Sequence, residues 1–221
     1  MELYIDSANL SEIQKTAEIG IISGVTTNPT LLAKEDPSLD VKELIKHIHA
    51  TIGGHVSVEV ISTDTKGMLQ EAEDILKWFP EATIKIPMIP NGLAAVKELS
   101  RQDIPTNVTL IFSPGQALAA NNAGATYVSV FLGRLDDIGS DGIAVVRETC
   151  EIWDTQGLES MIIAASIRHP IHVLECAKAG ADIATVPYKI LQQMMKHPLT
   201  DAGVRAFITD HENMMKSKGG V

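Results

Sequence analysis

A lysine inside an apolar segment is the residue of this sequence with the most evident chemistry. Lys85 lies in residues 82–87, where apolar and polar side chains alternate as in a β-strand, and it shares a face with Thr83. An amine that is removed from water loses the solvation of its charged form, and a neutral amine attacks carbonyl carbons to form a Schiff base. Taken alone, Lys85 is more simply explained as a strand-end lysine that reaches solvent. The polar residues elsewhere in the chain favour the first interpretation.

Polar or charged side chains recur near the ends of the segments that we predict to be strands. Besides Lys85, this set contains Asp6, Thr26, Asn28, Ser57, Glu59, Thr83, Asn107, Thr109, Ser129, Arg134, Ser166 and Arg168, many of them two residues apart. Each has a simpler explanation by itself. Asp6 can cap the next helix, and Arg134 can pair with Asp136 and Asp137 in an exposed loop. Because the burial of so many polar groups must be compensated, their joint placement indicates a functional site.

The residue types predict carbon–carbon bond chemistry on a sugar. An imine between Lys85 and a ketose carbonyl withdraws electrons and allows cleavage of the bond between the carbons α and β to it. Asp6 is the candidate base for the hydroxyl group of the bond that breaks. Glu59, with Thr109 and a water molecule, is the candidate acid and base for the formation and hydrolysis of the imine.

The remaining polar residues suit the binding of a phosphorylated sugar. Neutral hydrogen-bonding groups and one ring are available for the sugar itself, and we assign this role to Thr26, Asn28, Asn107, Ser129 and Phe131. Arg134 and Arg168, with Ser166, offer a phosphate clamp, because guanidinium groups bind phosphate through two parallel hydrogen bonds.

Strand-like and helix-like segments alternate along nearly the whole chain. The predicted strands are residues 3–6, 22–26, 55–61, 82–87, 105–111, 125–132, 161–166 and 182–186, and a helical segment follows each of them. Such repeats give parallel strands with right-handed crossovers. They predict an α/β fold, a single (β/α)8 TIM barrel, whose active site lies at the carboxyl ends of the strands. A doubly wound open sheet is the alternative, but the chain lacks the glycine-rich phosphate motifs that favour it.

A ninth helical segment follows the last strand–helix unit. We assign residues 1–198 to the barrel and residues 199–221 to a C-terminal helix and tail, which belongs to the same domain or packs on a neighbouring subunit. Val204, Phe207, Ile208, His211 and Met215 form a stripe at helical spacing. Because a barrel is already closed, this stripe must be buried on the outside of the barrel or on another subunit.

Composition excludes several classes of protein. The chain has 221 residues, of which 45% are hydrophobic, and this is enough for one sizeable core. Its net charge of −10 argues against a nucleic-acid surface. No apolar run is long enough to span a membrane, and the acidic N-terminus does not resemble a signal peptide. Cys150 and Cys176 both fall in helical patterns, which fits a reduced cytoplasmic protein.

The histidines do not complete a metal site. His169 and His172 stand three residues apart, and His47 and His49 two apart, but no grouping of carboxylates or cysteines accompanies them. We interpret them as surface or helix-end residues. His211 begins like a zinc-protease helix, but methionine occupies position 215, where the motif requires histidine. We therefore expect neither a metal nor another cofactor.

Five ordered motifs resemble those of a known family. They are GVTTNPT at residues 24–30, IKIP at 84–87, TNVTL at 106–110, FLGRLDD at 131–137 and ASIR at 165–168. They are similar to the signatures of the short microbial transaldolases, a family that also holds the fructose-6-phosphate aldolases. The resemblance covers residues 1–210, almost the whole chain.

The resemblance implies an activity and assigns the same residues to it. Members are metal-independent Schiff-base barrels that move a dihydroxyacetone unit from a ketose phosphate to an aldose phosphate, in the pentose phosphate pathway. Lys85 matches the Schiff-base lysine, Asp6 the acid and base of bond cleavage, and Glu59 with Thr109 the pair that holds the catalytic water. The donor-binding residues match Asn28, Asn107 and Ser129, and the phosphate site matches Arg134, Ser166 and Arg168. Members also assemble as pentamers or pairs of pentamers, with the C-terminal helix on a neighbour.

Two positions bear on the branch of the family. The aldolase branch has glutamine where this chain has Glu59, and tyrosine where it has Phe131. A tyrosine would hydrogen-bond the catalytic water and help release free dihydroxyacetone, whereas Phe131 cannot donate. The residues therefore favour transfer, and fructose-6-phosphate aldolase is the alternative. A third possibility is a sugar-phosphate-binding barrel without turnover, against which the complete catalytic set argues. Val130 departs from the proline that relatives often have.

Overall fold

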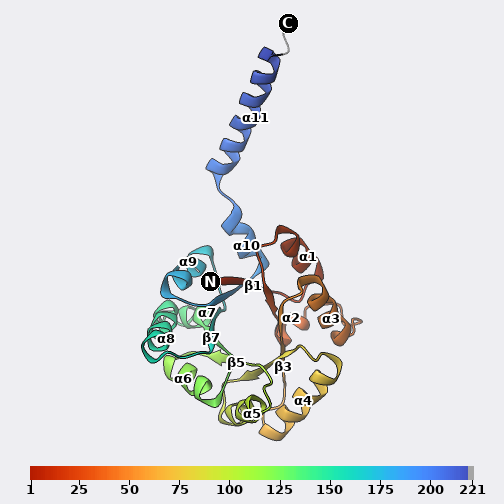
Figure 1. Cartoon of the computed structure of the whole chain (residues 1–221), viewed down its shortest axis with the longest axis vertical. Coiled ribbons are helices and arrows are strands. Elements are labelled where there is room, and N and C mark those ends of the chain that lie inside the picture. Colours follow the sequence, from red (N-terminus) through yellow and green to blue (C-terminus); the bar gives the residue numbers. More distant parts are fainter. Residues whose placement is uncertain (219–221) are drawn as a thin grey trace.

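The strands pair in the order of the sequence and close into a ring. In the computed structural model, which describes residues 1–218, each strand is hydrogen-bonded in parallel to the next, and the last strand to the first. The strands are β1 (Glu2–Asp6), β2 (Gly24–Thr26), β3 (His55–Glu59), β4 (Thr83–Pro87), β5 (Thr106–Ile111), β6 (Tyr127–Phe131), β7 (Met161–Ala165) and β8 (Ile183–Val186). Parallel neighbours need a crossover between them, which the alternation of strand and helix segments provides. The predicted (β/α)8 barrel is confirmed (Figure 1).

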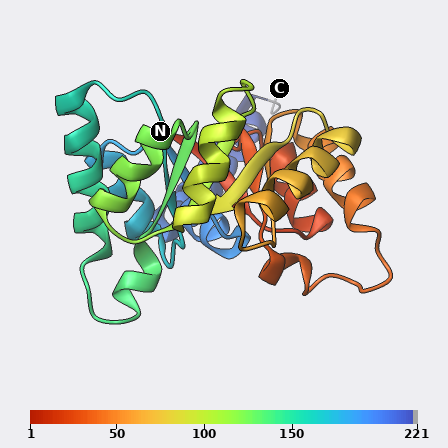
Figure 2. The ribbon, with the colours of Figure 1, turned by 90° about the horizontal axis from the view of Figure 1, so that it is seen from below.

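Helices surround the ring of strands (Figure 1), and Figure 2 shows them from the side. They are α1 (Leu10–Ile19), α2 (Pro29–Leu32), α3 (Val41–Ile52), α4 (Thr65–Trp78), α5 (Pro90–Ser100), α6 (Pro114–Ala123), α7 (Leu132–Asp136), α8 (Gly142–Gln156), α9 (Pro170–Ala179), α10 (Tyr188–Met195) and α11 (Pro198–Lys218). Local signals set their ends. The side chains of Asn9, Asp64 and Asp141 accept hydrogen bonds from backbone N–H groups in the first turns of α1, α4 and α8. Gly20 and Gly53 end α1 and α3 in the left-handed conformation that glycine adopts without strain.

Two local features differ from the sequence-based predictions. The sixth strand ends at Phe131, and the chain turns there directly into the five-residue helix α7, which the periodicity of the sequence does not reveal. The fifth strand contains a bulge between Val108 and Ile111, where Leu110 has a φ of 61°. A bulge interrupts the alternation of side chains, so the inward and outward order of this strand holds only up to its middle.

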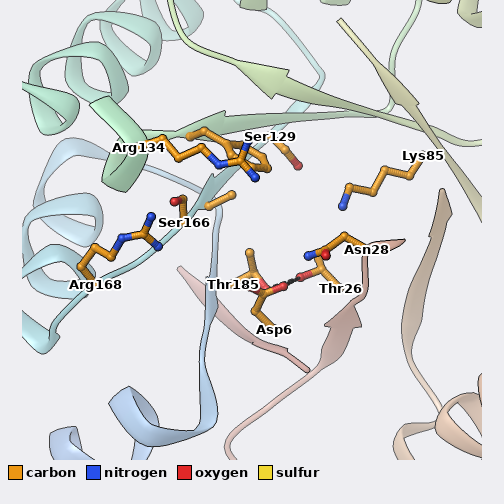
Figure 3. A pocket seen from close by; sticks show the side chains of 11 residues that line it. Asp6, Thr26, Asn28, Lys85, Ser129, Arg134, Ser166, Arg168 and Thr185 are labelled. Carbon is orange, nitrogen blue, oxygen red and sulfur yellow. Dashed lines mark hydrogen bonds between the residues drawn. The ribbon is translucent and has the colours of Figure 1, made fainter. Parts of the chain in front are cut away.

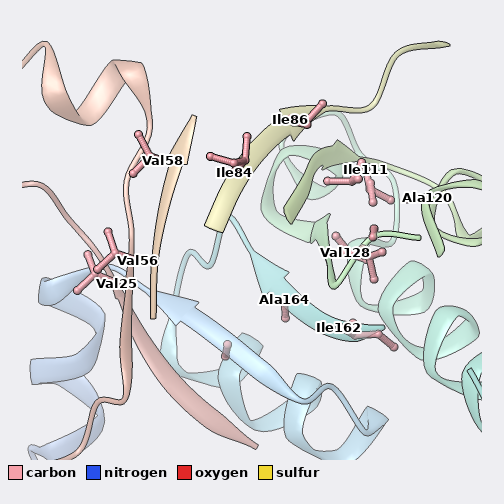
Figure 4. Packing of buried hydrophobic residues seen from close by; sticks show 14 of the residues in the cluster. Val25, Val56, Val58, Ile84, Ile86, Ile111, Ala120, Val128, Ile162 and Ala164 are labelled. Carbon is pink, nitrogen blue, oxygen red and sulfur yellow. The ribbon is translucent and has the colours of Figure 1, made fainter. Parts of the chain in front are cut away.

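The main hydrophobic core lies between the outside of the barrel and the helices. Outward-facing strand residues supply much of it, including Val25, Val56, Val58, Ile84, Ile86, Val128, Ile162 and Ala164 (Figure 4). Successive side chains of a strand point to opposite faces, so the residues between these point into the barrel. A smaller apolar cluster of Tyr4, Ile163 and Ile183 lies apart from the main core. These residues come from the inward-facing positions of their strands, and much of the remaining barrel interior is polar.

Helix α11 projects away from the barrel (Figure 1). Its predicted apolar stripe is exposed: Phe207 is 76% exposed, and Val204, Ile208 and Met215 are each more than half exposed. The helix is therefore present as predicted, but its apolar face is not covered by the described residues of its own chain. None of the helices in residues 1–218 is both long and apolar enough to cross a membrane.

Candidate active site

A polar cavity opens at the carboxyl ends of the strands. Its volume is about 150 Å³, and its lining consists of Asp6, Thr26, Asn28, Lys85, Ser129, Phe131, Arg134, Ala165, Ser166, Arg168 and Thr185 (Figure 3). Nine of the residues predicted for the site are among them. Because parallel strands end on one face of a barrel, residues that are far apart in the sequence meet there.

Lys85 is the buried amine of this cavity. Lys85 is 4% exposed, and its Nζ donates a hydrogen bond to the backbone carbonyl of Thr27 at 2.9 Å. Nζ also lies 3.0 Å from Oε2 of Glu59 on the adjacent strand β3. A carboxylate at this distance can accept a proton from the amine. An amine that loses its proton to this neighbour is a nucleophile for a carbonyl carbon placed in the cavity.

Asp6 faces the cavity from the end of β1. Its Oδ1 accepts a hydrogen bond from Oγ1 of Thr26 at 3.0 Å, and Thr26 Oγ1 in turn lies 2.5 Å from Oγ1 of Thr185. Burial raises the pKa of the Asp6 carboxyl above its usual value, while the charge of Lys85 and the hydrogen bond from Thr26 oppose that shift. A carboxyl group with a raised pKa binds a proton more readily than an ordinary aspartate, which suits a group that takes up a proton and returns it.

Three predicted residues do not line the cavity. Glu59 lies beside Lys85, with its side chain 14% exposed. Asn107 is fully buried on β5 and hydrogen-bonds Oγ of Ser129 through its Oδ1 at 2.7 Å. Thr109, which is 1% exposed, has a buried hydroxyl oxygen with no hydrogen-bond partner among the described residues. Buried hydroxyl groups are usually hydrogen-bonded, and the predicted catalytic water would give Thr109 such a partner.

Asn28 lies at the rim, directly after β2. Its Oδ1 accepts a hydrogen bond from the backbone N–H of Leu31 at 2.9 Å and caps the short helix α2. The carbonyl oxygen of the side chain is therefore engaged in the protein. The amide N–H groups remain the part of Asn28 that can serve a ligand, so this residue is suited to donate to sugar oxygens.

The two arginines of the predicted phosphate clamp lie on the same side of the cavity, near Ser166 (Figure 3). Arg134, on α7, lies over the ring of Phe131 with Cζ 5.1 Å from its centroid. The guanidinium group of Arg168 is paired with Asp137 at 2.7 Å. The ring of Phe131 restricts Arg134 without using its donors. Asp137, in contrast, accepts from Nε and Nη2 of Arg168 and so competes with a phosphate group for that guanidinium group. Two guanidinium groups beside a serine hydroxyl group provide the donors that a phosphate dianion requires.

The backbone of Ser166 is held in an uncommon conformation. Its φ is 65°, which side chains other than glycine rarely adopt. The backbone of α7 packs closely on this residue: a Cβ atom at Gly133 would lie 1.9 Å from the carbonyl oxygen of Ser166. Only glycine at position 133 therefore allows α7, the helix that contains Arg134, to pack this closely on Ser166.

His172 connects the elements that carry the arginines. Its Nδ1 accepts a hydrogen bond from the backbone N–H of Arg168 at 3.3 Å, and its Nε2 lies 3.0 Å from Oδ2 of Asp136. Burial and the neighbouring His169 lower the pKa of His172, so a neutral ring with the proton on Nε2 satisfies both contacts. Both histidines lie at the start of α9, as the predicted helix-end interpretation requires, but His172 is buried rather than on the surface.

Sequence reasoning missed Thr185, Ala165 and the support of Arg168. Thr185 is the one hydroxyl residue in the otherwise apolar strand β8, and its position two residues after Ile183 is the signal that places it inside the barrel.

Among the described residues, no group of three or more His, Cys, Asp or Glu side chains could hold a metal ion. Cys150 and Cys176 are buried free cysteines on α8 and α9.

The chain is similar to known proteins over nearly its whole length. Residues 3–218 match the family model described as Transaldolase/Fructose-6-phosphate aldolase. A "Probable transaldolase" of Clostridium botulinum (strain Eklund 17B / Type B) is 55% identical over 216 residues, which cover 98% of this chain and 100% of that protein. A "Probable transaldolase" of Heliobacterium modesticaldum is 54% identical, over 97% of this chain and 99% of its own. A "Probable transaldolase 1" of Listeria monocytogenes is 53% identical, over 98% and 100%.

Proposed function

The chain belongs to the transaldolase/fructose-6-phosphate aldolase family, and from this premise we propose that it is a transaldolase that works through a Schiff base on Lys85. The donor is a ketose phosphate, sedoheptulose 7-phosphate or fructose 6-phosphate, and the acceptor is glyceraldehyde 3-phosphate or erythrose 4-phosphate. The observation that carries the proposal is the buried Nζ of Lys85, 3.0 Å from Glu59 and open to a polar cavity.

The reaction begins with the loss of a proton from the amine of Lys85. Glu59 takes this proton, and Nζ attacks the carbonyl carbon of the donor, C2 of the ketose, to form a carbinolamine. Glu59, acting through a water molecule held with Thr109, protonates the departing hydroxyl group, which leaves as water and gives the imine. Thr109, whose hydroxyl group makes no hydrogen bond to any of the described residues, can donate to or accept from such a water molecule.

Asp6 then controls the carbon–carbon bond. It takes the proton of the hydroxyl group on C4, the bond between C3 and C4 breaks, and the electron pair moves into the imine to give an enamine. The aldose phosphate leaves, and the enamine carbon attacks the aldehyde carbon of the acceptor. Asp6 returns its proton to the new hydroxyl group, and water releases the product from Lys85. The raised pKa of Asp6 supports its role as a proton carrier.

Two features favour transfer over the release of dihydroxyacetone. Phe131 lines the cavity and carries no group that could protonate the enamine carbon. Glu59, rather than glutamine, is the neighbour of Lys85. The enamine therefore persists until an aldehyde arrives. The reaction uses side-chain proton transfers throughout, so we propose that no metal or other cofactor takes part.

Assembly and location are further parts of the proposal. The apolar stripe of α11 is exposed in the single chain, which supports a homo-oligomer, a pentamer or decamer, in which the helix lies on a neighbour. We place the enzyme in the cytoplasm and the pentose phosphate pathway, with sugar phosphates as its partners rather than nucleic acid or membranes.

Borohydride trapping tests the Schiff base. Wild-type protein incubated with fructose 6-phosphate and borohydride should acquire a reduced three-carbon adduct, which peptide mass spectrometry should locate on Lys85. Lys85→Met should abolish the adduct. Lys97→Met, at an exposed position on α5, is the matched control and should trap normally. Trapping that persists in folded Lys85→Met protein would refute the proposed nucleophile.

Product analysis separates the two branches of the family. Fructose 6-phosphate alone should give no free dihydroxyacetone, whereas addition of erythrose 4-phosphate should give glyceraldehyde 3-phosphate and sedoheptulose 7-phosphate. Accumulation of dihydroxyacetone without an acceptor would instead establish an aldolase and refute our interpretation of Glu59 and Phe131. Binding without any product would identify a non-catalytic barrel.

A further inference from the structure

A chain of hydrogen bonds runs through the barrel interior from the amino-terminal ends of the strands to the cavity. It begins at His55, the first residue of β3, whose Nε2 lies 2.7 Å from Oγ of Ser57. Asn107 donates through Nδ2 to the same Ser57 oxygen at 3.1 Å, and its Oδ1 accepts from Oγ of Ser129 at 2.7 Å. Ser129 lines the cavity, while Ser57 and Asn107 are fully buried. The chain therefore connects a residue outside the active site to one inside it.

Once one group in this chain of hydrogen bonds is fixed as donor or acceptor, the donor of every other hydrogen bond in it is fixed as well. Ser57 Oγ accepts a hydrogen bond from Asn107, so its own proton is available to Nε2 of His55. Nε2 can accept that proton only if the ring is neutral and carries its hydrogen on Nδ1. At the other end, the hydroxyl group of Ser129 donates its hydrogen bond to Oδ1 of Asn107. Ser129 is left with lone pairs and no proton for the cavity, and thus acts there as an acceptor.

The opposite direction would change what the cavity offers. If Nε2 of His55 carried the hydrogen, it would donate to Ser57, Ser57 would donate to Asn107, and the Asn107 amide would have to turn over. Asn107 would then donate to Ser129, whose proton would be free to point into the cavity. The ring of His55 and the hydroxyl group of Ser129 are coupled in this way, although Ser57 and Asn107 separate them.

The surroundings of His55 favour the neutral ring with hydrogen on Nδ1. The ring packs between Tyr4 and Tyr127, with centroid distances of 5.2 and 4.5 Å. Burial lowers the pKa of His55 to about 4, although the charge of Glu2 opposes that shift. Nδ1 lies 3.5 Å from Oγ1 of Thr83, an oxygen that can accept from it.

We propose that His55 is a positioning residue: it holds the hydrogen-bond chain in one direction and so makes Ser129 an acceptor for a hydroxyl group of the donor substrate. The recognition of a donor hydroxyl group by Ser129 rests on the proposed function, whereas the direction of the hydrogen bonds from His55 to Ser129 does not. A donor hydroxyl group gives its proton to Ser129 Oγ, and the three-carbon unit is thereby oriented relative to Lys85. His55 itself contacts no substrate.

Nitrogen NMR tests the chain without any assay of activity. Protein labelled with ¹⁵N in histidine should show, at pH 7.5, one neutral histidine with a proton on Nδ1 and a hydrogen-bonded, unprotonated Nε2. The signal that disappears in His55→Gln identifies it. A proton on Nε2 of His55, or a charged ring at this pH, would overturn the proposal whether or not the protein is a transaldolase.

Kinetics test the consequence for the donor. His55→Phe keeps a ring between the tyrosines but cannot accept a hydrogen bond, and it should lower kcat/KM for fructose 6-phosphate about tenfold, mainly through KM. His55→Gln places a carbonyl oxygen near Ser57 and should recover most of this loss. The KM of the acceptor should not change. Tyr127→Phe, which alters the same aromatic cluster without touching the chain, should behave as wild type.

Ser57→Ala gives an independent check because it interrupts the chain one step further on. Its effect on donor KM should match that of His55→Phe, and the double variant should be no worse than either single variant. Equal kcat/KM in His55→Phe and wild type, or no recovery in His55→Gln, would overturn the proposal. Wild-type protein without transfer activity would refute the proposed function instead, and the NMR result would then decide the direction of the chain.

Discussion

The contact between Lys85 and Glu59 predicts a large and specific coupling in stability. The two groups lie 3.0 Å apart, with side chains that are 5% and 14% exposed. At this distance their attraction is about 5 kcal/mol for an effective dielectric constant of 20, and much of it offsets the cost of removing both charges from water. The pair therefore adds little net stability, but each partner is costly to bury alone.

Glu59→Leu should leave the ammonium group of Lys85 buried, with the Thr27 carbonyl as its only hydrogen-bond partner among the described residues. We expect this change to lower the free energy of unfolding by about 3–5 kcal/mol, since removal of one partner of a buried pair leaves an uncompensated charge. Lys85→Met should cost less, because Glu59 is nearer to solvent. The double variant should recover to within about 2 kcal/mol of wild type.

Calorimetry and urea denaturation at pH 7.5 measure this cycle. For a chain of this length, 1 kcal/mol shifts Tm by about 2–4 °C, so Glu59→Leu should melt at least several degrees below wild type. The exposed pair Lys46–Glu43, at 2.9 Å, is the matched control, and its coupling should stay below about 1 kcal/mol. Additive effects of Lys85→Met and Glu59→Leu would refute the reasoning, because they would mean that the two buried charges do not compensate each other.

Three further predictions concern the acid and the phosphate site. Asp6→Asn should abolish transfer but raise Tm by several degrees at pH 8. Burial raises the pKa of Asp6, so the folded protein loses stability as pH rises through that pKa and the carboxyl group ionises. The advantage of Asn over Asp in Tm should therefore vanish below the ordinary pKa of 3.8, where Asp6 is protonated in both the folded and the unfolded chain. Gly133→Ala should raise KM for fructose 6-phosphate about tenfold or more, because the new Cβ lies 1.9 Å from a backbone oxygen of the phosphate site. Asp137→Asn should lower that KM by up to about fivefold, since Arg168 no longer has a competing carboxylate and exposed pairs are worth at most about 1 kcal/mol.

Each of these predictions has a control and a contrary result. A stabilisation by Asp6→Asn that does not vary with pH would contradict the raised pKa. Gly115→Ala meets no atom within 4 Å and should leave KM unchanged, so an equal effect at positions 115 and 133 would exclude the steric explanation. A higher KM in Asp137→Asn would show that the ion pair positions Arg168 rather than competing for it.

Period-two alternation explains why much of the site was predictable. It separates Lys85 from Ile84 and Ile86, and Ser129 from Val128, so the residues that face the barrel interior can be read from the chain once the strands are known. The barrel itself follows from the alternation of strands and helices. The five motifs agree with roles that the residue types had already indicated, and they extend to Arg134 and Arg168, which lie beyond the ends of their strands.

The missed features depend on contacts rather than on patterns. Helix α7 is too short to show a periodicity, so the sequence predicts no helix around Arg134. The bulge at Leu110 depends on strand register, which no local signal in the sequence indicates. The pairs of Arg168 with Asp137 and of His172 with Asp136 join segments that lie about 30 residues or more apart, and only the folded chain brings them together.

The two faces of each strand have different tasks, and this affects how the protein can change. Outward residues such as Val56 and Ile84 form the main core with the helices, whereas their neighbours Ser57 and Lys85 face the interior and the cavity. A substitution on the inner face leaves the packing between strands and helices in place and acts instead on recognition, on reactivity and on the balance of buried charge, as at Lys85 and Glu59. A substitution on the outer face alters stability and leaves the reacting groups in place. Mutational drift in specificity can therefore proceed on one face of the strands while the other preserves the fold.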